Sequence, residues 1–360
     1  MINNNINYYI DKGGACCGLT WSLRMKQNIK RRISTTNQYE PTRTKSRFWS
    51  TSSRGSWLII LIILLSSGCG VDKGKEVTNR PVNRIVSTAP SNTEIIVDLG
   101  QAHRLVAIDK HSANVFGVLD NLPLLDFFYP DAEVIINLKP DLIIASGHNP
   151  TGSGEDPFRL LREMGIPVVY ISMSKSIENI YEDISLIAEL LNAKEEGEAL
   201  IAATREQIAA IAAQTTAQFA AQFAQNTDGI ENKPSVYFEI SAAPLMLTFG
   251  KESFIHNMIS IVGARNIFEN ETWLVQPSAE RIIALNPDII ITNVNYIDDP
   301  IGEIKSRPGF NHINAVINIR VYQIDNDSSS RSSARIVLAL RQMSEAINSE
   351  RAHTEAQGRK

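Results

Sequence analysis

The sequence predicts an α/β protein of two similar lobes joined by a long helical segment. Three observations support this prediction. Short apolar runs alternate with helical patterns in both halves of the chain, one pattern of 13 residues occurs twice, and residues 176–225 are rich in Ala, Glu, Gln and Leu with one Gly and no Pro. Strands that alternate with helices are typical of a mainly parallel sheet covered on both faces.

The repeated pattern covers residues 132–144 and 279–291. Nine of its thirteen positions are identical at a constant offset of 147, and Pro130 and Pro277 precede the two copies at the same distance. This period is far too long for a solenoid, so it indicates two related lobes.

The joining segment is predicted to form two helices. In its first part, apolar side chains recur at steps of three and four, which is typical of a helix with one buried face. Residues 192–194 indicate a break, and a second helix over residues 198–225 would span about 42 Å at 1.5 Å per residue. The apolar positions of the first helix are Ile177, Ile180, Tyr181, Ile184, Ile187, Ala188 and Leu191.

The elements of each lobe follow from the same patterns. In the first lobe, the helix that starts at residues 91–94 is expected to end at Leu99, because Gly100 follows. The remaining expectations are strands at 84–87, 105–108, 142–145, 168–171, 236–240, 289–292 and 321–324, and helices at 158–164, 253–262, 279–285 and 333–347.

The first 68 residues are predicted to be a lipoprotein-type signal segment. They carry ten Lys and Arg against two acids, whereas the remaining residues carry 25 against 37. Residues 57–65 form an unbroken apolar run of nine, which fits a secretory signal and is short for a membrane span. Small residues then precede Cys69, so we expect Cys69 to carry the lipid. The alternative interpretation is a free cysteine behind a membrane anchor.

The remaining boundaries follow composition. We expect a tether over 69–83, an N-terminal lobe over 84–175, bridging helices over 176–233, a C-terminal lobe over 234–348 and a polar tail over 349–360. After residue 68 only Cys69 remains, so the exported protein is expected to lack an internal disulfide.

Several motifs in order resemble one family. Residues 84–94, both copies of the repeat, and the segments 249–254, 263–268 and 332–337 resemble substrate-binding proteins of ABC transporters that import cobalamin, haem and ferric siderophores. The resemblance covers about residues 84–348. It implies two Rossmann-like lobes on a helical backbone, a ligand cleft between the lobes, and a monomer that serves a permease dimer with its ATPase.

The two repeats each carry a glutamate, Glu133 and Glu280, in the first turn of a helix. A carboxylate there is favoured by the helix dipole, which is a purely structural explanation. The resemblance implies instead that both dock on arginines of the permease, and equivalent groups on two lobes suit a two-fold partner.

The resemblance also implies ligand-binding residues. Phe127 and Trp273 lie before the repeats, where cobalamin-binding members stack aromatic rings on the ligand. Asp327 and Arg331 keep the spacing of a pair that faces the corrin side chains, and core packing or a surface ion pair is the structural alternative. We predict that the ligand-binding residues are His111, Phe127, Tyr129, Trp273, Asp327 and Arg331.

Other classes of function have little support. The chain has no nucleotide-binding or hydrolase motif, its six His are scattered, and its acidic balance after residue 68 disfavours nucleic acid. We therefore predict a non-enzyme without cofactor or resident metal: an exported lipoprotein, anchored at the membrane in the periplasm or at the cell surface, that delivers a cobalt corrinoid. The alternatives are a haem or ferric-siderophore carrier and a lipid-anchored Rossmann-like enzyme.

Overall fold

A computed structural model describes residues 81–147, 156–223 and 233–349, with the backbone alone for residues 218–223. The expected signal segment, Cys69 and the expected polar tail apart from Ser349 lie outside these ranges. Within the described part of the chain, no helix is long and apolar enough to cross a membrane.

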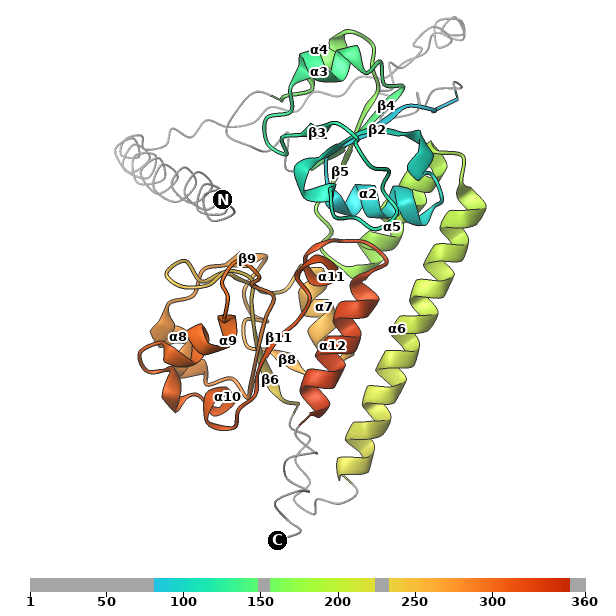
Figure 1. The fold of residues 1–360 in the computed structure, drawn as a ribbon. Coiled ribbons are helices and arrows are strands. Elements are labelled where there is room, and N and C mark those ends of the chain that lie inside the picture. Colours follow the sequence, from blue (N-terminus) through green and yellow to red (C-terminus); the bar gives the residue numbers. More distant parts are fainter. Residues whose placement is uncertain (1–80, 148–155, 224–232, 350–360) are drawn as a thin grey trace, which may run out of the picture. The chain divides into compact units, whose positions relative to one another are not determined.

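The first sheet has five parallel strands in the order β3-β2-β1-β4-β5, and we call the unit around it the N-lobe (Figure 1). Its central strands β1 and β4 are fully buried, because helices cover both faces. Its elements are β1 (Ile85–Ser87), α2 (Pro90–Asp98), η1 (Ala102–Arg104), β2 (Leu105–Asp109), η2 (Lys110–Ser112), β3 (Leu124–Leu125), α3 (Ala132–Asn137), β4 (Leu142–Ser146), α4 (Arg159–Glu163) and β5 (Val168–Ile171).

The second sheet has four parallel strands in the order β11-β10-β6-β8, and we call the unit around it the C-lobe. A separate antiparallel pair, β7 with β9, lies in the same lobe. The elements are β6 (Ser235–Glu239), β7 (Thr248–Phe249), α7 (Phe254–Ile261), β8 (Arg265–Asn266), β9 (Leu274–Val275), α8 (Ala279–Leu285), β10 (Ile289–Thr292), α9 (Pro300–Ser306), η3 (Phe310–His312), α10 (Asn314–Ile317), β11 (Val321–Gln323), α11 (Asn326–Ser330) and α12 (Ile336–Asn348).

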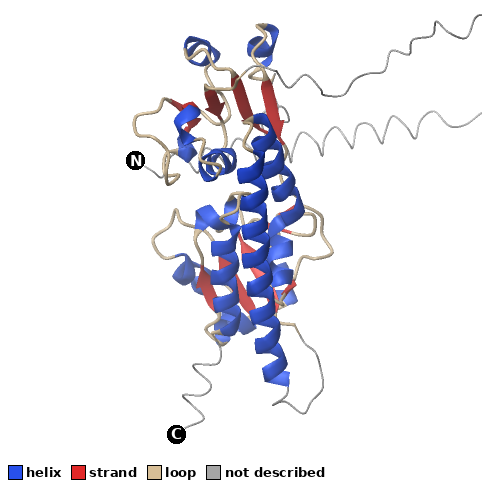
Figure 2. Ribbon diagram, turned by 90° about the vertical axis from the view of Figure 1, so that its right-hand side faces the viewer, coloured by secondary structure: helices blue, strands red, loops and turns tan. Residues whose placement is uncertain are grey.

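The two bridging helices are α5 (Ile177–Leu190) and α6 (Lys194–Phe223). The hydroxyl of Ser176 caps α5, and Asn192 adopts a left-handed φ of 53° at the break between the helices. The break is shorter than expected, because Lys194 already belongs to α6. Helix α6 packs against α5 and α12, and long helices run beside strands of both lobes (Figure 2). One apolar core cluster includes residues of both lobes and both bridging helices. The predicted α/β fold of two lobes on a helical backbone is therefore confirmed.

The sequence repeat is also a repeat in structure. Helices α3 and α8 are each followed by a left-handed residue, Lys139 or Asn286, and then by Pro-Asp. The carboxylate of that Asp then accepts a backbone N–H at the start of the lobe's first strand, from Arg84 to Asp141 and from Ser235 to Asp288, both at 2.9 Å. The repeat therefore conserves the turn that joins a short helix to a central strand.

One departure from expectation lies before α12. We expected a helix from Ser333, but α12 begins at Ile336 and a separate short helix, α11, precedes it. The hydroxyl of Ser333 donates to Glu94 of the N-lobe, which fixes the segment between the two helices outside a helical path. The contact that overrides the helical pattern is thus a long-range one.

Candidate functional site

All the predicted ligand residues except Trp273 lie on segments that follow the carboxyl ends of parallel strands, where open α/β sheets place their ligands. Strand β2 leads into His111, and β11 leads into α11, which carries Asp327 and ends before Arg331. The two segments meet, because Asn114 donates to Oδ2 of Asp327 at 2.7 Å. The fold therefore brings His111, Asp327 and Arg331 to the junction of the lobes.

The N-lobe aromatic residues form a group of their own. The ring of Phe127 lies edge-on to that of His111, with 6.1 Å between centroids, and edge-on to that of Phe128 at 4.9 Å. The carboxylate of Asp126 fixes their loop by accepting the backbone N–H groups of Phe128 and Tyr129, both at 3.0 Å. Tyr129 remains 73 % exposed, so the group offers aromatic surface to solvent.

A chain of buried hydroxyl groups holds the His111 segment against α2. Ser87 lies 2.8 Å from Thr93, and Thr93 lies 2.9 Å from Ser112. Ser112 in turn donates to the carboxylate of Asp109, which also accepts the backbone N–H of His111 at 2.8 Å. Burial raises the pKa of Asp109, and the hydrogen bonds from Ser112 and His111 oppose this shift. The segment of His111 and the helix α2 thus form one fixed unit.

Arg331, just after α11, is the centre of a polar group that joins the C-lobe to the N-lobe. Its Nη1 donates to Oε1 of Glu94 at 2.8 Å, and its Nη2 lies 2.8 Å from Oδ1 of Asp327. The same Nη2 donates to Oδ1 of Asn114 at 2.8 Å and to the carbonyl of His111 at 3.2 Å. Both terminal nitrogens of the guanidinium therefore have acceptors within the protein.

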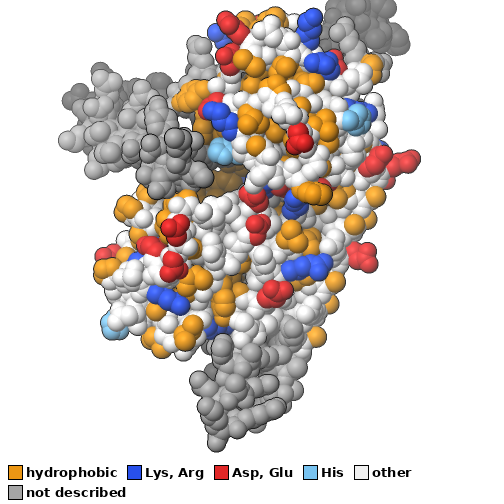
Figure 3. Space-filling model, viewed as in Figure 1, with side chains coloured by type: hydrophobic (Ala, Val, Ile, Leu, Met, Phe, Trp, Pro, Cys, Tyr) orange, Lys and Arg blue, Asp and Glu red, His pale blue; other side chains and the backbone are white. Residues whose placement is uncertain are grey.

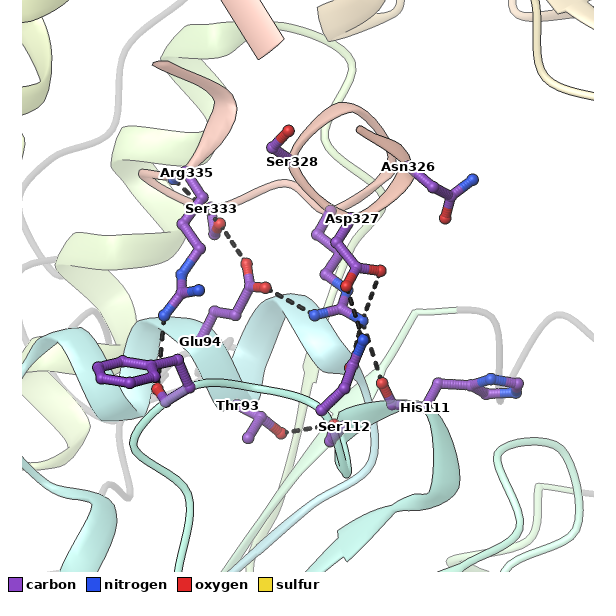
Figure 4. Close-up of polar contacts among 12 residues, drawn as sticks. Thr93, Glu94, His111, Ser112, Asn326, Asp327, Ser328, Ser333 and Arg335 are labelled. Carbon is purple, nitrogen blue, oxygen red and sulfur yellow. Dashed lines mark hydrogen bonds and ion pairs between the residues drawn. The ribbon is translucent and has the colours of Figure 1, made fainter. Parts of the chain in front are cut away.

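The second oxygen of Glu94 completes this group. The hydroxyl of Ser333 donates to Oε2 of Glu94 at 2.6 Å, as Figure 4 shows. The carbonyl of His111 faces the group, whereas its imidazole points away from it (Figure 4). We call this set the interlobe network; its members are Glu94, Asn114, Asp327, Arg331, Ser333 and the carbonyl of His111.

Trp273 lies apart from these residues, directly before β9. Its N–H donates to the carbonyl of Lys251, and its own carbonyl accepts the N–H of Gly250, both at 2.8 Å. A side chain at Gly250 would clash with the carbonyl of Glu271. Trp273 adopts a left-handed φ of 61°, which is costly for a bulky residue and is typical of functional positions. Its ring lies edge-on to that of Phe249, with 5.3 Å between centroids.

Glu133 and Glu280 occupy equivalent positions in the first turns of α3 and α8. Asp131 caps α3, Ser278 caps α8, and both glutamates are exposed. The backbone N–H of Glu280 and the hydroxyl of Ser278 lower the pKa of the Glu280 carboxylate. Acidic and basic side chains are interspersed over the face drawn in Figure 3.

The chain matches, over residues 85–328, the family described as periplasmic binding protein. It belongs to the periplasmic binding protein family. The resemblance of this sequence to substrate-binding proteins of the cobalamin, haem and ferric-siderophore importers is thereby confirmed. Members of this family are substrate-binding transport proteins, and they work with permease and ATPase partners.

This periplasmic binding protein matches its relatives over most of their length. An uncharacterized ABC transporter substrate-binding lipoprotein of Bacillus subtilis, YvrC, is 29% identical over 73% of this chain and 79% of its own. A vitamin B12-binding protein of Vibrio campbellii is 27% identical over 74% of this chain and 90% of its own. The crystal structure of a possible iron-binding, periplasmic solute-binding protein of Staphylococcus epidermidis is 29% identical, with a TM-score of 0.64, over 74% of this chain and 99% of that one.

Three members of the interlobe network were not expected from the sequence of this periplasmic binding protein. Glu94 and Ser333 lie in segments that carry the resemblance, but no local signal indicates the contacts of Glu94, Asn114 and Ser333, because their partners lie more than 200 positions away. A glutamate in the middle of an otherwise buried helix is the one feature that could have drawn attention to Glu94.

Within the described ranges, no group of three or more His, Cys, Asp and Glu could hold a metal ion.

Proposed function

We propose that this protein captures a cobalt corrinoid and delivers it to the permease of an ABC importer. The observation that carries the proposal is the pairing of aromatic surfaces with a polar junction. Phe127 and Tyr129 lie in the N-lobe and Trp273 in the C-lobe, while Asp327 and Arg331 lie where the lobes meet. A corrinoid has a flat ring for the aromatic residues and amide groups for the polar ones.

The similarity to a vitamin B12-binding protein, over nearly the whole length of that relative, also supports this proposal. Asp327 accepts from amide N–H groups, and the Asp327–Arg331 pair fixes its position. His111 stands beside Phe127, so its ring completes the same aromatic surface. The ligand-binding residues of the proposal are thus the six that the sequence predicted.

Tryptophan fluorescence tests the proposal. Replacing Trp21, Trp49 and Trp57 by phenylalanine in the full chain leaves Trp273 as the one tryptophan. A corrinoid absorbs where tryptophan emits, so cyanocobalamin should quench Trp273 saturably with one-to-one stoichiometry. Asp327→Ala should weaken binding. A flat titration at micromolar cyanocobalamin would contradict the proposal of a corrinoid.

Haem or a ferric siderophore is the second candidate. The imidazole of His111 is exposed and points away from the interlobe network, so it could coordinate an iron ion (Figure 4). The similarity to a possible iron-binding protein supports this alternative. Quenching by hemin, with a Soret band that shifts and is lost in His111→Ala, would favour haem over a corrinoid.

Delivery requires docking, which we propose for Glu133 and Glu280. Both are exposed, and equivalent positions on two lobes can meet the two subunits of a permease dimer. Glu133→Ala and Glu280→Ala should each reduce uptake by cells while ligand affinity stays unchanged. Normal uptake by both variants would contradict the docking role.

We further propose that the protein is exported and anchored through a lipid on Cys69. The apolar run over 57–65 and the small residues before Cys69 support this, as does the similarity to a lipoprotein. Mass spectrometry of protein purified from membranes should find an acylated Cys69 at the N-terminus. Cys69→Ala protein that still carries lipid would contradict the anchor.

A further inference from the structure

We infer that Glu94 is a positioning residue for the ligand site: a buried carboxylate of the N-lobe that sets the orientation of Arg331, and through it of Asp327 and Asn114, at the lobe junction. The inference rests on the proposed function and adds to it a residue that does not itself contact the ligand. The geometry of the interlobe network carries the argument (Figure 4).

Both carboxylate oxygens of Glu94 accept hydrogen bonds from residues on the C-terminal side of the chain. It lies in α2 between buried neighbours, and its own side chain is 1 % exposed. One oxygen accepts from Arg331 and the other from Ser333. Charge-assisted hydrogen bonds to a carboxylate are the strong ones. Glu94 therefore fixes two points of the segment that follows α11.

Arg331 connects Glu94 to Asp327, which is the more exposed residue of the network. Its side chain is 10 % exposed, whereas that of Asp327 is 37 % exposed. Nη2 of Arg331 contacts one oxygen of Asp327, and Asn114 donates to the other. The exposed edge of the network is thus an acceptor whose orientation two donors define, and it suits a ligand that carries N–H or O–H groups at its rim.

Loss of the Glu94 charge should change this orientation rather than only weaken the fold. Of the two carboxylates that contact Arg331 in the described part of the chain, Asp327 would remain, and the contacts with Asn114 and the carbonyl of His111 compete for the same Nη2. Because the His111 segment is fixed to α2, a shift of Arg331 moves Asp327 relative to the N-lobe. A ligand that spans the junction would then meet a displaced acceptor.

The C-lobe offers a matched control. Glu239 is as buried as Glu94, at 1 % exposure, and accepts two hydrogen bonds from Arg307 within the same lobe. A Glu→Gln change at either position removes one buried charge of an ion pair. A merely structural role predicts that both variants lose stability and that neither loses affinity once the folded fraction is taken into account.

The experiment compares Glu94→Gln with Glu239→Gln in the full chain, with cyanocobalamin as the probe and equilibrium dialysis at a temperature where both variants are folded. We expect affinity at least about tenfold weaker for Glu94→Gln and changed by less than about twofold for Glu239→Gln. The double variant Glu94→Gln/Arg331→Gln leaves no unpaired buried charge, so it should regain thermal stability without regaining affinity. Equal affinity losses in the two single variants, or none in either, would overturn the inference.

A second measurement is independent of the ligand. Amide hydrogen exchange should accelerate at residues 111–115 and 325–333 in Glu94→Gln but not in Glu239→Gln. If the wild-type protein binds neither cyanocobalamin, hemin nor a ferric siderophore, the proposed function fails while the exchange result still decides the inference. Unchanged exchange in both segments of Glu94→Gln would overturn it.

Discussion

The N-lobe and the C-lobe each bury a glutamate against an arginine, but the two pairs join different things. Glu239 and Arg307 belong to one lobe, separated by 68 positions. Glu94 belongs to the N-lobe and Arg331 to the C-terminal side, separated by 237 positions. The first pair therefore supports the packing of a single lobe, whereas the second ties one lobe to the other.

The surroundings of the two arginines differ as well. Arg307 has two carboxylate partners, Glu239 and Glu303. Burial lowers the pKa of Arg307, but the hydrogen bonds to these carboxylates outweigh burial and raise that pKa above its ordinary value. Arg331 divides its donors between carboxylates, an amide and a carbonyl. The same two residue types can therefore make a closed pair, whose arginine binds carboxylates within one lobe. They can also make an open pair, whose arginine binds further groups at the candidate ligand site.

The largest expected effect tests the closed pair. Arg307→Met leaves Glu239 buried without its cation, which should lower the free energy of unfolding by about 3–5 kcal/mol. Urea denaturation followed by circular dichroism measures this loss. Arg265→Met is the control, because Arg265 forms an i,i+4 pair with Glu269 in the same lobe with both side chains partly exposed; its cost should stay below about 1 kcal/mol. Similar costs for the two variants would remove the distinction between a buried and a surface pair.

A smaller effect concerns Asp183, a carboxylate that accepts a hydrogen bond from a hydroxyl group. Asp183 on α5 is partly buried, and its Oδ2 accepts from the hydroxyl of Ser174 at 2.7 Å. Burial raises the pKa of Asp183 to about 6, while the hydrogen bond from Ser174 opposes the shift. Because the folded protein holds this proton more tightly than the unfolded chain, the stability that Asp183 contributes is complete below the ordinary aspartate pKa of 3.8 and is lost as the pH rises through about 6.

Asp183→Asn should therefore raise the free energy of unfolding at pH 7 by about 1–2 kcal/mol, since two pKa units are worth roughly 3 kcal/mol at most and Asp183 is partly exposed. The free energy of unfolding, measured from pH 4 to pH 7, should decline less steeply in the variant than in the wild type. Glu189→Gln, at an exposed position of the same helix, is the control and should leave the slope nearly unchanged. A slope that Asp183→Asn does not alter would show that Asp183 is solvated like an exposed residue.

The sequence predicted the repeated parts of both lobes well. Strands β5 and β10 and helix α8 have the expected bounds, because apolar runs and the repeat define them locally. The break near Asn192 was also expected. These features depend on neighbours within a few positions, which a single sequence displays directly.

The interlobe network could not be predicted in the same way. The spacing of Asp327 and Arg331 indicated a pair, and the structure places them in contact. Their link to Glu94 depends on the fold bringing α2 to the end of α11, and nothing near Glu94 specifies which arginine it meets. The helical pattern predicted a helix from Ser333, because the sequence does not reveal that the Ser333 hydroxyl donates to Glu94. Long-range polar contacts are thus what the pattern leaves out.

The smallest expected effect tests the feature that the lobes share. Asp141 and Asp288 occupy equivalent turns, and both are partly exposed. At the start of a first strand, Asp141 accepts the backbone N–H groups of Asn83 and Arg84, and Asp288 accepts the backbone N–H and the hydroxyl of Ser235. Burial raises the pKa of Asp288, but hydrogen bonds from Ser235 outweigh it and leave that pKa lowered. The contribution of Asp288 should therefore be complete above the ordinary aspartate pKa of 3.8 and be lost as the pH falls below that value.

Asp141→Asn and Asp288→Asn should each cost about 1 kcal/mol near neutral pH, because a neutral amide oxygen is a weaker acceptor than a carboxylate. Denaturation at pH 7 and pH 3 measures both costs, and that of Asp288→Asn should shrink at pH 3. Costs that differ by more than about 1 kcal/mol at pH 7 would mean that the lobes share the sequence of this turn but not its energetic role.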